Sequence, residues 1–172
     1  MYCLIVAMDQ NGIIGQGNSI PWHLSEDLRR FRLITLNQIV IMGRKTYDSL
    51  PFKNGLPNRI NVVITRDKKG YVDIPGKLYF ISMDDLDDLI MKIKQDKRVF
   101  VIGGNEIYKA LFSRCELIYL TLIYRPGSVI DNDSVIFDCD LTQEKFINVY
   151  ESGNFVKNNL EYEFYTYFRV RN

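Results

Sequence analysis

Asp27 stands where the sequence predicts the buried face of a helix. The stretch PWHLSEDLRRF, residues 21–31, predicts a helix whose buried positions recur at i, i+3, i+4 and i+7, namely Leu24, Asp27, Leu28 and Phe31. The solvated faces of this helix would carry Glu26, Arg29, Arg30 and Arg32. A buried carboxylate is costly unless it is hydrogen-bonded, so a polar ligand or ordered water would have to complete its partners. Asp27 is therefore a candidate functional acid, although a salt bridge or a helix cap would also explain it.

Two glycine-containing junctions follow predicted strands and could approach phosphate groups. In IVIMGRKT, residues 39–46, a glycine precedes two basic residues and a threonine, but Gln38 occupies the position of the first P-loop glycine. In VIGGNEIY, residues 101–108, paired glycines precede a helix without completing the G-x-G-x-x-G pattern. Either junction alone could be a plain turn. Together with Thr65 and Arg66 at a third strand end, they place phosphate-binding groups along one sheet edge, where α/β folds bind ligands.

Composition and residue types exclude several other classes of site. The chain has 22 basic and 21 acidic side chains, so it lacks the basic excess of a nucleic-acid-binding protein. His23 is the only histidine, which argues against a catalytic triad, and we expect it to be a solvated loop residue. Cys3, Cys115 and Cys139 are spaced for neither a zinc site nor a disulfide framework, and they suit a reducing cytoplasm. No stretch has the length and apolarity of a membrane span, and the N-terminus lacks the flanks of a signal peptide.

Short apolar runs bounded by turn residues predict the strands that would position these groups. They cover residues 2–8, 38–43, 60–65, 77–82, 99–104 and 117–123. The runs are continuous rather than alternating, which is typical of strands covered on both faces, and helical patterns separate several of them. At 172 residues the chain fits one domain, 1–172. The sequence therefore predicts a single α/β domain with a mainly parallel sheet.

Helical and C-terminal patterns complete this prediction. Residues 82–98 predict the clearest helix, with a possible capping box between Ser82 and Asp85. A second helix, NEIYKALFS, follows the paired glycines. KFINVY and LEYEFYTYFRV, residues 145–150 and 160–170, predict an antiparallel hairpin that closes the sheet, and RPGSVIDNDS predicts a loop.

An ordered series of motifs resembles dihydrofolate reductase over nearly the whole chain. The motifs are NGIIGQGNSIPWHLSEDLRRF, IVIMGRKTYDSL, LPNRINVVIT, FVIGGNEIY and IYLTLI. The resemblance implies a central, mainly parallel eight-stranded sheet with an antiparallel C-terminal strand, flanked by about four helices. It also implies NADPH-dependent reduction of 7,8-dihydrofolate to tetrahydrofolate, with hydride transfer to the pterin C6 and protonation of N5.

The resemblance implies a substrate pocket around Asp27. This carboxylate would accept hydrogen bonds from the pterin N3 and 2-amino groups as a bidentate pair, and would favour protonation of N5 through water. Trp22 and Thr121 would hold the associated water and polar contacts, and Arg59 would clamp the glutamate α-carboxylate of the substrate. Tyr108 joins Asp27, Trp22 and Thr121 among the expected catalytic residues. The matched apolar substrate contacts are Ile5, Ala7, Leu28, Phe31, Leu50, Leu56 and Ile102.

A cofactor site is implied beside this pocket. Ile102 and Tyr108 match residues near the nicotinamide, and Gly103 and Gly104 match a pair that takes a cis peptide bond in the family. The other matched positions are Ala7, Ile14, Gly15, Ile20, Gly43, Arg44, Lys45, Thr46, Thr65, Arg66, Asn105, Glu106 and Ile107. The basic residues among them suit a 2′-phosphate and favour NADPH over NADH. Residues 9–24 would form a mobile active-site loop with glycines at 12, 15 and 17.

The sequence leaves two alternatives to this enzyme. A reductase of the same fold could act on another pterin or on a riboflavin-pathway intermediate, but Asp27 and Arg59 together would then have no purpose. A non-catalytic folate-binding or structural protein of the same fold would not need every reactive position to be filled. We expect a monomer that acts on the small molecule dihydrofolate, with no metal, nucleic acid or membrane as partner.

Overall fold

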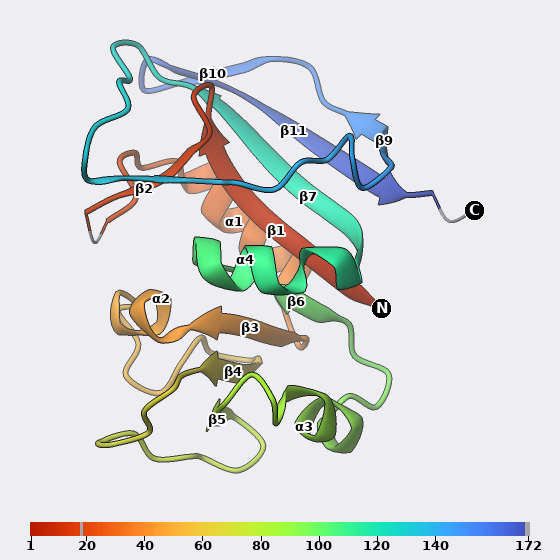
Figure 1. The fold of residues 1–172 in the computed structure, drawn as a ribbon. Helices are drawn as coiled ribbons and strands as arrows, with labels where there is room; N and C mark the ends of the chain where they lie inside the picture. Colours follow the sequence, from red (N-terminus) through yellow and green to blue (C-terminus); the bar gives the residue numbers. More distant parts are fainter. Residues whose placement is uncertain (18, 171–172) are drawn as a thin grey trace.

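One large sheet forms the centre of the computed structural model, which describes residues 1–17 and 19–170. In spatial order its strands are β10 (Phe155–Lys157), β11 (Leu160–Arg169), β7 (Cys115–Tyr124), β1 (Tyr2–Asp9), β6 (Val99–Val101), β3 (Ile39–Gly43), β4 (Ile60–Ile64) and β5 (Leu78–Ile81), and β9 (Phe146–Glu151) pairs with β11. The pairs from β7 to β5 are parallel, whereas β9, β10 and β7 pair with β11 in antiparallel fashion. The predicted mainly parallel sheet is confirmed, and so is the predicted C-terminal hairpin, because β9 pairs antiparallel with β11 (Figure 1). Strand β10, which lies in the polar stretch between the two hairpin strands, adds one strand to the predicted eight.

The central strands are continuously apolar because helices cover both faces of the sheet. Every residue from Ile39 to Met42 in β3 is 0% exposed. Helix α1 (Ser25–Thr35) packs on one face, whereas α3 (Leu86–Ile93) and α4 (Asn105–Leu111) pack on the other (Figure 1). The short helix α2 (Arg44–Asp48) follows β3 directly. Parallel strands buried on both faces are what the continuous apolar runs predict.

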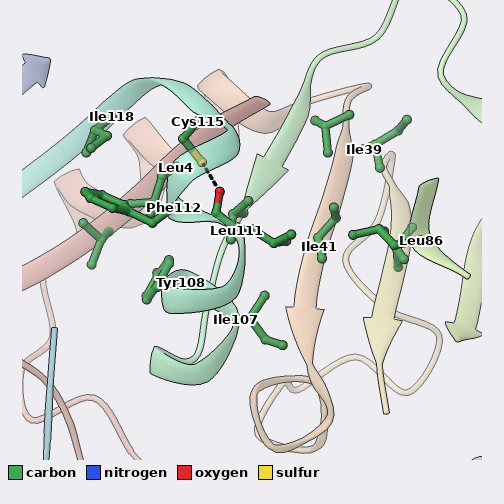
Figure 2. Close-up of a cluster of buried hydrophobic side chains, with 14 of the residues drawn as sticks. Leu4, Ile39, Ile41, Leu86, Ile107, Tyr108, Leu111, Phe112, Cys115 and Ile118 are labelled. Atoms are coloured by element: carbon green, nitrogen blue, oxygen red, sulfur yellow. Dashed lines mark hydrogen bonds between the residues drawn. The ribbon is translucent and has the colours of Figure 1, made fainter. Parts of the chain in front are cut away.

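The contact between α4 and the sheet fixes the chain at the end of β6. Figure 2 shows Ile107, Tyr108 and Leu111 of α4 pointing toward apolar side chains of the sheet, including Leu4. Just after the helix, the Cys115 thiol donates a hydrogen bond of 3.3 Å to the Leu111 carbonyl oxygen. Burial of these side chains holds α4, and with it the glycine pair that precedes α4, against the carboxyl ends of β1 and β3.

The helix predicted over residues 82–98 is shorter in the structure. The Ser82 hydroxyl donates to Asp85 Oδ2 at 2.7 Å and accepts from the Asp85 N–H at 3.3 Å, but these contacts close a turn that precedes α3. The helix ends at Ile93, and Gln95 has a φ of 43°, so the chain has left the helical conformation before residue 98.

Within the part of the chain that the structure describes, no helix is long and apolar enough to cross a membrane.

Two short strands correspond to no strand that the sequence predicts. Strand β2 (Ile13–Gln16) pairs antiparallel with β8 (Ser134–Ile136) and forms a small second sheet beyond the end of β1. These strands are too short to show a periodic pattern, and their pairing depends on residues more than a hundred positions apart. The predicted strand over 99–104 likewise ends early, at Val101, because the glycine pair takes the chain away from the sheet.

Candidate active site

Several of the predicted site residues meet at the carboxyl ends of the central parallel strands. Ala7 on β1 is in register with Thr121 on β7, and the Thr121 hydroxyl donates a hydrogen bond of 2.6 Å to Asp27 Oδ1 on α1. The Tyr108 hydroxyl on α4 donates to the Ile5 carbonyl oxygen on β1 at 2.9 Å. Four elements therefore converge here, and hydrogen bonds fix their relative positions.

Asp27 is a half-buried carboxylate with spare hydrogen-bonding capacity. Among the described residues, only Thr121 donates a hydrogen bond to it. Burial raises the pKa of Asp27 above its ordinary value, while the Thr121 hydrogen bond and the positive charge of Arg30 act in the opposite direction. An ionised carboxylate offers about four acceptor sites, so Asp27 can accept further hydrogen bonds from a ligand.

The face of α1 that packs on the sheet is rotated from the predicted one. Leu28, predicted to be buried, is 50% exposed. Arg30, predicted to be solvated, is half-buried and donates to main-chain oxygens of β7 and β11. Phe31 and Ile34 pack against the core beside it. The inward face thus runs through positions 27, 30, 31 and 34, and the guanidinium is tolerated there because it finds carbonyl acceptors and aromatic ring faces.

The other apolar residues of the predicted pocket fall into two packed clusters. One lies between α1 and the sheet and contains Ile5, Phe31, Leu50, Leu56 and Ile102. The second contains Ala7, Trp22 and Leu24. The structure therefore places the predicted apolar contacts in two clusters, whereas Leu28 lies on the exposed side of α1.

Arg59 is a buried cation whose partners are all neutral oxygens. Its side chain donates to Thr35 Oγ1 at 2.9 Å, to the Pro57 carbonyl at 2.7 Å and to the Arg32 carbonyl at 3.2 Å. The residue is 7% exposed, and none of the ion pairs among the described residues involves it. Burial, followed by the charge of Arg32, lowers the pKa of Arg59. A buried guanidinium without a carboxylate is well placed to bind an anionic group.

The two glycine junctions are in direct contact. The Gly43 N–H donates to the Gly103 carbonyl oxygen at 2.8 Å, and the Gly103–Gly104 peptide bond is cis. Gly103 has a φ of 113°, and a Cβ there would lie 3.2 Å from the Tyr108 ring. A Cβ at Gly43 would lie 3.1 Å from the Ile107 side chain. Glycine at these two positions lets the two segments of backbone approach this closely. Main-chain groups therefore lie at this edge of the sheet.

The structure does not bring all the predicted cofactor contacts together. Thr65 is buried and bonds the neighbouring main chain, whereas Asn105 accepts from a main-chain N–H beyond β8 at 3.3 Å. Arg44 pairs with Asp48 at 2.7 Å on the outside of α2. The predicted contacts that are exposed and form no ion pair with another described residue are Lys45, Arg66 and Glu106.

Asp9, at the end of β1, is a buried acid that the sequence analysis missed. Its Oδ1 accepts from the main-chain N–H groups of Asn11 at 2.9 Å and Ile13 at 3.0 Å. Its Oδ2 accepts from Arg125 at 3.2 Å and from the Ser128 hydroxyl. Burial would raise the pKa of Asp9, but these hydrogen bonds, led by that of Ser128, outweigh it and lower the pKa. The only signal in the sequence was an acid that closes an apolar strand.

The predicted active-site loop, residues 9–24, lies against the segment that contains β8. Ile14 packs on the core, Gly15 is half-buried and Ile20 is 58% exposed. The Gly17 N–H donates to the Asp133 carbonyl oxygen at 2.9 Å. Position 18 lies outside the described residues. The mobility of this loop stays a prediction.

Comparisons with known proteins agree with this arrangement. A family model described as dihydrofolate reductase matches residues 1–169. Dihydrofolate reductase of Bacillus subtilis (strain 168) is 34% identical over 167 residues, which cover 97% of this chain and 94% of the relative. Dihydrofolate reductase type 6 of Proteus mirabilis is 39% identical over 122 residues, 71% of this chain and 74% of the relative. The solved structure of dihydrofolate reductase from Enterococcus faecalis, complexed with NADP(H) and RAB-propyl, is similar with a TM-score of 0.77 and 26% identity, and the match covers 99% of this chain and 97% of the other. This chain belongs to the dihydrofolate reductase family.

Proposed function

We propose that this chain catalyses the NADPH-dependent reduction of 7,8-dihydrofolate to 5,6,7,8-tetrahydrofolate, which would supply one-carbon metabolism and thymidylate synthesis. Family membership supports the reaction, and the Enterococcus faecalis relative complexed with NADP(H) supports the cofactor. The observation that carries the proposal is the environment of Asp27, a half-buried carboxylate that receives one protein hydrogen bond at the strand ends.

Asp27 would recognise the edge of the pterin ring. The pterin presents its N3 and 2-amino donors side by side, and the two oxygens of one carboxylate can accept from both. Thr121 donates to Oδ1 and would steady the carboxylate while the ring is bound. Asp27 would thereby orient the ring for hydride transfer to C6 and favour protonation of N5 through water near Trp22.

The glycine junctions would hold the cofactor, which supplies the hydride when bound. Close packing of Gly43 against Gly103 leaves a strip of main chain that a dinucleotide can approach. Lys45 and Arg66 are exposed cations without an ion-pair partner among the described residues, and they are suited to a 2′-phosphate. Arg44 would have to exchange Asp48 for a phosphate group to contribute.

Arg59 would bind the glutamate end of the substrate. Its guanidinium is buried against Phe31, with its carbon 5.6 Å from the ring centroid, and its hydrogen-bond partners among the described residues are neutral oxygens. A carboxylate placed here would gain a charge-assisted hydrogen bond and neutralise a buried cation. The apolar residues between Asp27 and Arg59, Phe31 and Leu56 among them, would cover the benzoyl ring.

Oxidation of NADPH in the presence of dihydrofolate tests the reaction. We expect the protein to consume both, and Asp27→Asn to lower kcat/KM by about 10²–10⁴-fold because it removes one of the two carboxylate acceptors and its charge. Protein that binds NADPH and folate without oxidising the cofactor would favour the non-catalytic alternative. Equal activity of Asp27→Asn would remove the role assigned to the carboxylate.

A substrate without the glutamate moiety tests Arg59. We expect Arg59→Met to lower kcat/KM for dihydrofolate by about 10–100-fold, the worth of a charge-assisted hydrogen bond, and to leave kcat/KM for dihydropteroate nearly unchanged. Arg29→Met, which removes an exposed arginine from the same helix that carries Asp27, is the matched control. An equal loss of kcat/KM with both substrates would show that Arg59 supports the fold and does not bind the glutamate of the substrate.

A further inference from the structure

Arg30 lies inside the contact between α1 and the sheet, one helical turn beyond the site carboxylate. Its Nη1 donates to the Leu120 carbonyl at 3.3 Å and lies 3.4 Å from Thr121 Oγ1, and its Nη2 donates to the Tyr165 carbonyl at 3.2 Å. The guanidinium carbon lies 4.5 Å from the centroid of the Phe164 ring. These contacts hold a charged group in one place beside the site.

The contact between Arg30 and Thr121 determines the direction of the hydrogen bond to Asp27. A guanidinium has donors only, so the hydroxyl oxygen of Thr121 must be the acceptor. A hydroxyl carries one hydrogen, and the hydrogen of Thr121 is then free to point at Asp27 Oδ1, which lies 2.6 Å away. The hydrogen bonds in this row of three groups therefore run in one direction: the guanidinium donates to the hydroxyl, and the hydroxyl donates to the carboxylate.

We propose that Arg30 is a positioning residue for the reaction, which orients the Thr121 hydroxyl toward Asp27 and keeps the Asp27 carboxylate ionised for the two pterin donors. Bidentate recognition of two donors requires both oxygens as acceptors, and a protonated carboxyl would lose one of them. The inference rests on the proposed function, because it concerns how Asp27 meets the substrate.

Arg30 is the positively charged group that acts on the pKa of Asp27, after the larger effects of burial and of the Thr121 hydrogen bond. The ionisable groups that face the pair are Tyr119 on β7, Tyr150 on β9 and Tyr108 on α4. Burial raises the pKa of Tyr108 and of Tyr119, so both phenols stay neutral at working pH. Burial also raises the pKa of Asp27, and Arg30 is the cation whose charge opposes this rise among the described residues. A guanidinium remains protonated even when burial lowers its pKa.

Direct titration of Asp27 tests this role without turnover. The ¹³C signal of its carboxyl carbon, identified by its loss in Asp27→Asn, is followed against pH in the protein without substrate. We expect the midpoint to rise by about one pH unit in Arg30→Met, because an opposite charge at this range lowers the pKa of a carboxyl by that order. Arg30→Lys, which keeps the charge, should show a smaller rise. Arg29→Met, which removes an exposed arginine one position away, should show none.

The substrate provides the second readout. Binding of dihydrofolate should weaken as the pH falls through the Asp27 midpoint, and in Arg30→Met this loss should begin about one pH unit higher than in the original protein. A purely structural role would lower stability and leave this pH dependence in place. Failure of the original protein to reduce dihydrofolate would refute the proposed function, while the carboxyl titration would still decide the role of Arg30.

An unchanged midpoint in folded Arg30→Met would overturn the inference. Cooperative unfolding in urea shows whether the variant is folded. Arg30→Gln removes the charge but retains a donor for Thr121, so it serves if Arg30→Met does not fold. A rise in the Arg30→Gln midpoint supports the inference, and an unchanged midpoint contradicts it.

Discussion

Asp9 and Asp27 are two carboxylates shielded from water that the fold treats in opposite ways. Asp9 is 0% exposed and receives hydrogen bonds from two main-chain N–H groups, an arginine and a serine. From the described part of the chain, Asp27 receives one hydrogen bond, donated by Thr121. The pKa of Asp9 lies below its ordinary value, whereas that of Asp27 lies above it. A carboxylate used for structure has its acceptors filled by the protein, and one used for a ligand keeps acceptors free.

The two acids also differ in what they connect. Asp9 joins the start of the segment 9–24 to Arg125 and Ser128, close to the point where β2 pairs with β8. Asp27 joins α1 to β7 through Thr121, which in turn contacts Arg30. The difference predicts that substitutions at Asp9 change stability and substitutions at Asp27 change chemistry.

The largest effect on stability is expected from Asp9→Ala. The change leaves Arg125, whose side chain is 19% exposed, beside a cavity without its carboxylate, and breaking such a pair costs about 3–5 kcal/mol of unfolding free energy. Urea unfolding followed by the fluorescence of Trp22, the only tryptophan, measures it. Asp133→Ala, at an exposed acid on the facing segment, should change the free energy by less than about 0.5 kcal/mol. Equal losses of unfolding free energy in Asp9→Ala and Asp133→Ala would contradict the structural role assigned to Asp9.

A smaller loss is expected from Ser128→Ala. Its hydroxyl bonds a buried carboxylate, and a hydrogen bond to a charged group is worth about 1.5–3 kcal/mol. Because the folded pKa of Asp9 is lowered, its contribution is present above the ordinary value of 3.8 and is lost as the pH falls through the folded pKa. The difference in unfolding free energy between Ser128→Ala and the original protein should therefore shrink in acid. A difference in unfolding free energy that is constant with pH would show that the contribution of Ser128 does not depend on the ionisation of Asp9.

The smallest effect, with the opposite sign, is expected from Asp27→Asn. The folded pKa of Asp27 is raised, so the favourable contribution of the original acid is present below 3.8 and is lost as the pH rises through the folded pKa. Asp27→Asn should accordingly gain up to about 1 kcal/mol of unfolding free energy at neutral pH, and this gain should vanish in acid. Urea unfolding at the two pH values measures it. A loss comparable to that of Asp9→Ala would place Asp27 with the structural acids.

Patterns along the chain were sufficient for every strand of the large sheet except β10, and for Asp27. Continuous apolar runs identify parallel strands because both faces are covered, and an acid within an apolar helical spacing marks Asp27. The same spacing wrongly predicted a buried Leu28 and a solvated Arg30. The face that α1 turns to the sheet depends on carbonyl groups of β7 and β11, which local sequence does not contain. Resemblance to a family added the pocket around Arg59, which periodicity alone does not reveal.

The anchoring of Asp9 could not be predicted for a similar reason. Its partners Arg125 and Ser128 lie in a stretch that predicts a loop, and nothing local relates them to the end of β1. Strand β2 has four residues and β8 has three, so neither is long enough to carry a periodic signal. The helix predicted over 82–98 ends at Ile93, which is the last apolar residue of its buried stripe. The residues from 94 to 98 are all polar, and Gln95 among them has a positive φ.

The place of β1 between β6 and β7 has a consequence for synthesis of the chain on the ribosome. Tyr2 pairs with Val99 on one side and with Cys115 on the other, so neither edge of β1 has a partner until the chain has been made beyond those residues. Long-range parallel pairing of this kind is slow, and an apolar strand with two open edges invites aggregation. Strand β1 precedes the other strands of the sheet in the chain and yet must wait for β6 and β7 before it is paired, so nascent chains that stop before residue 99 should be bound by chaperones.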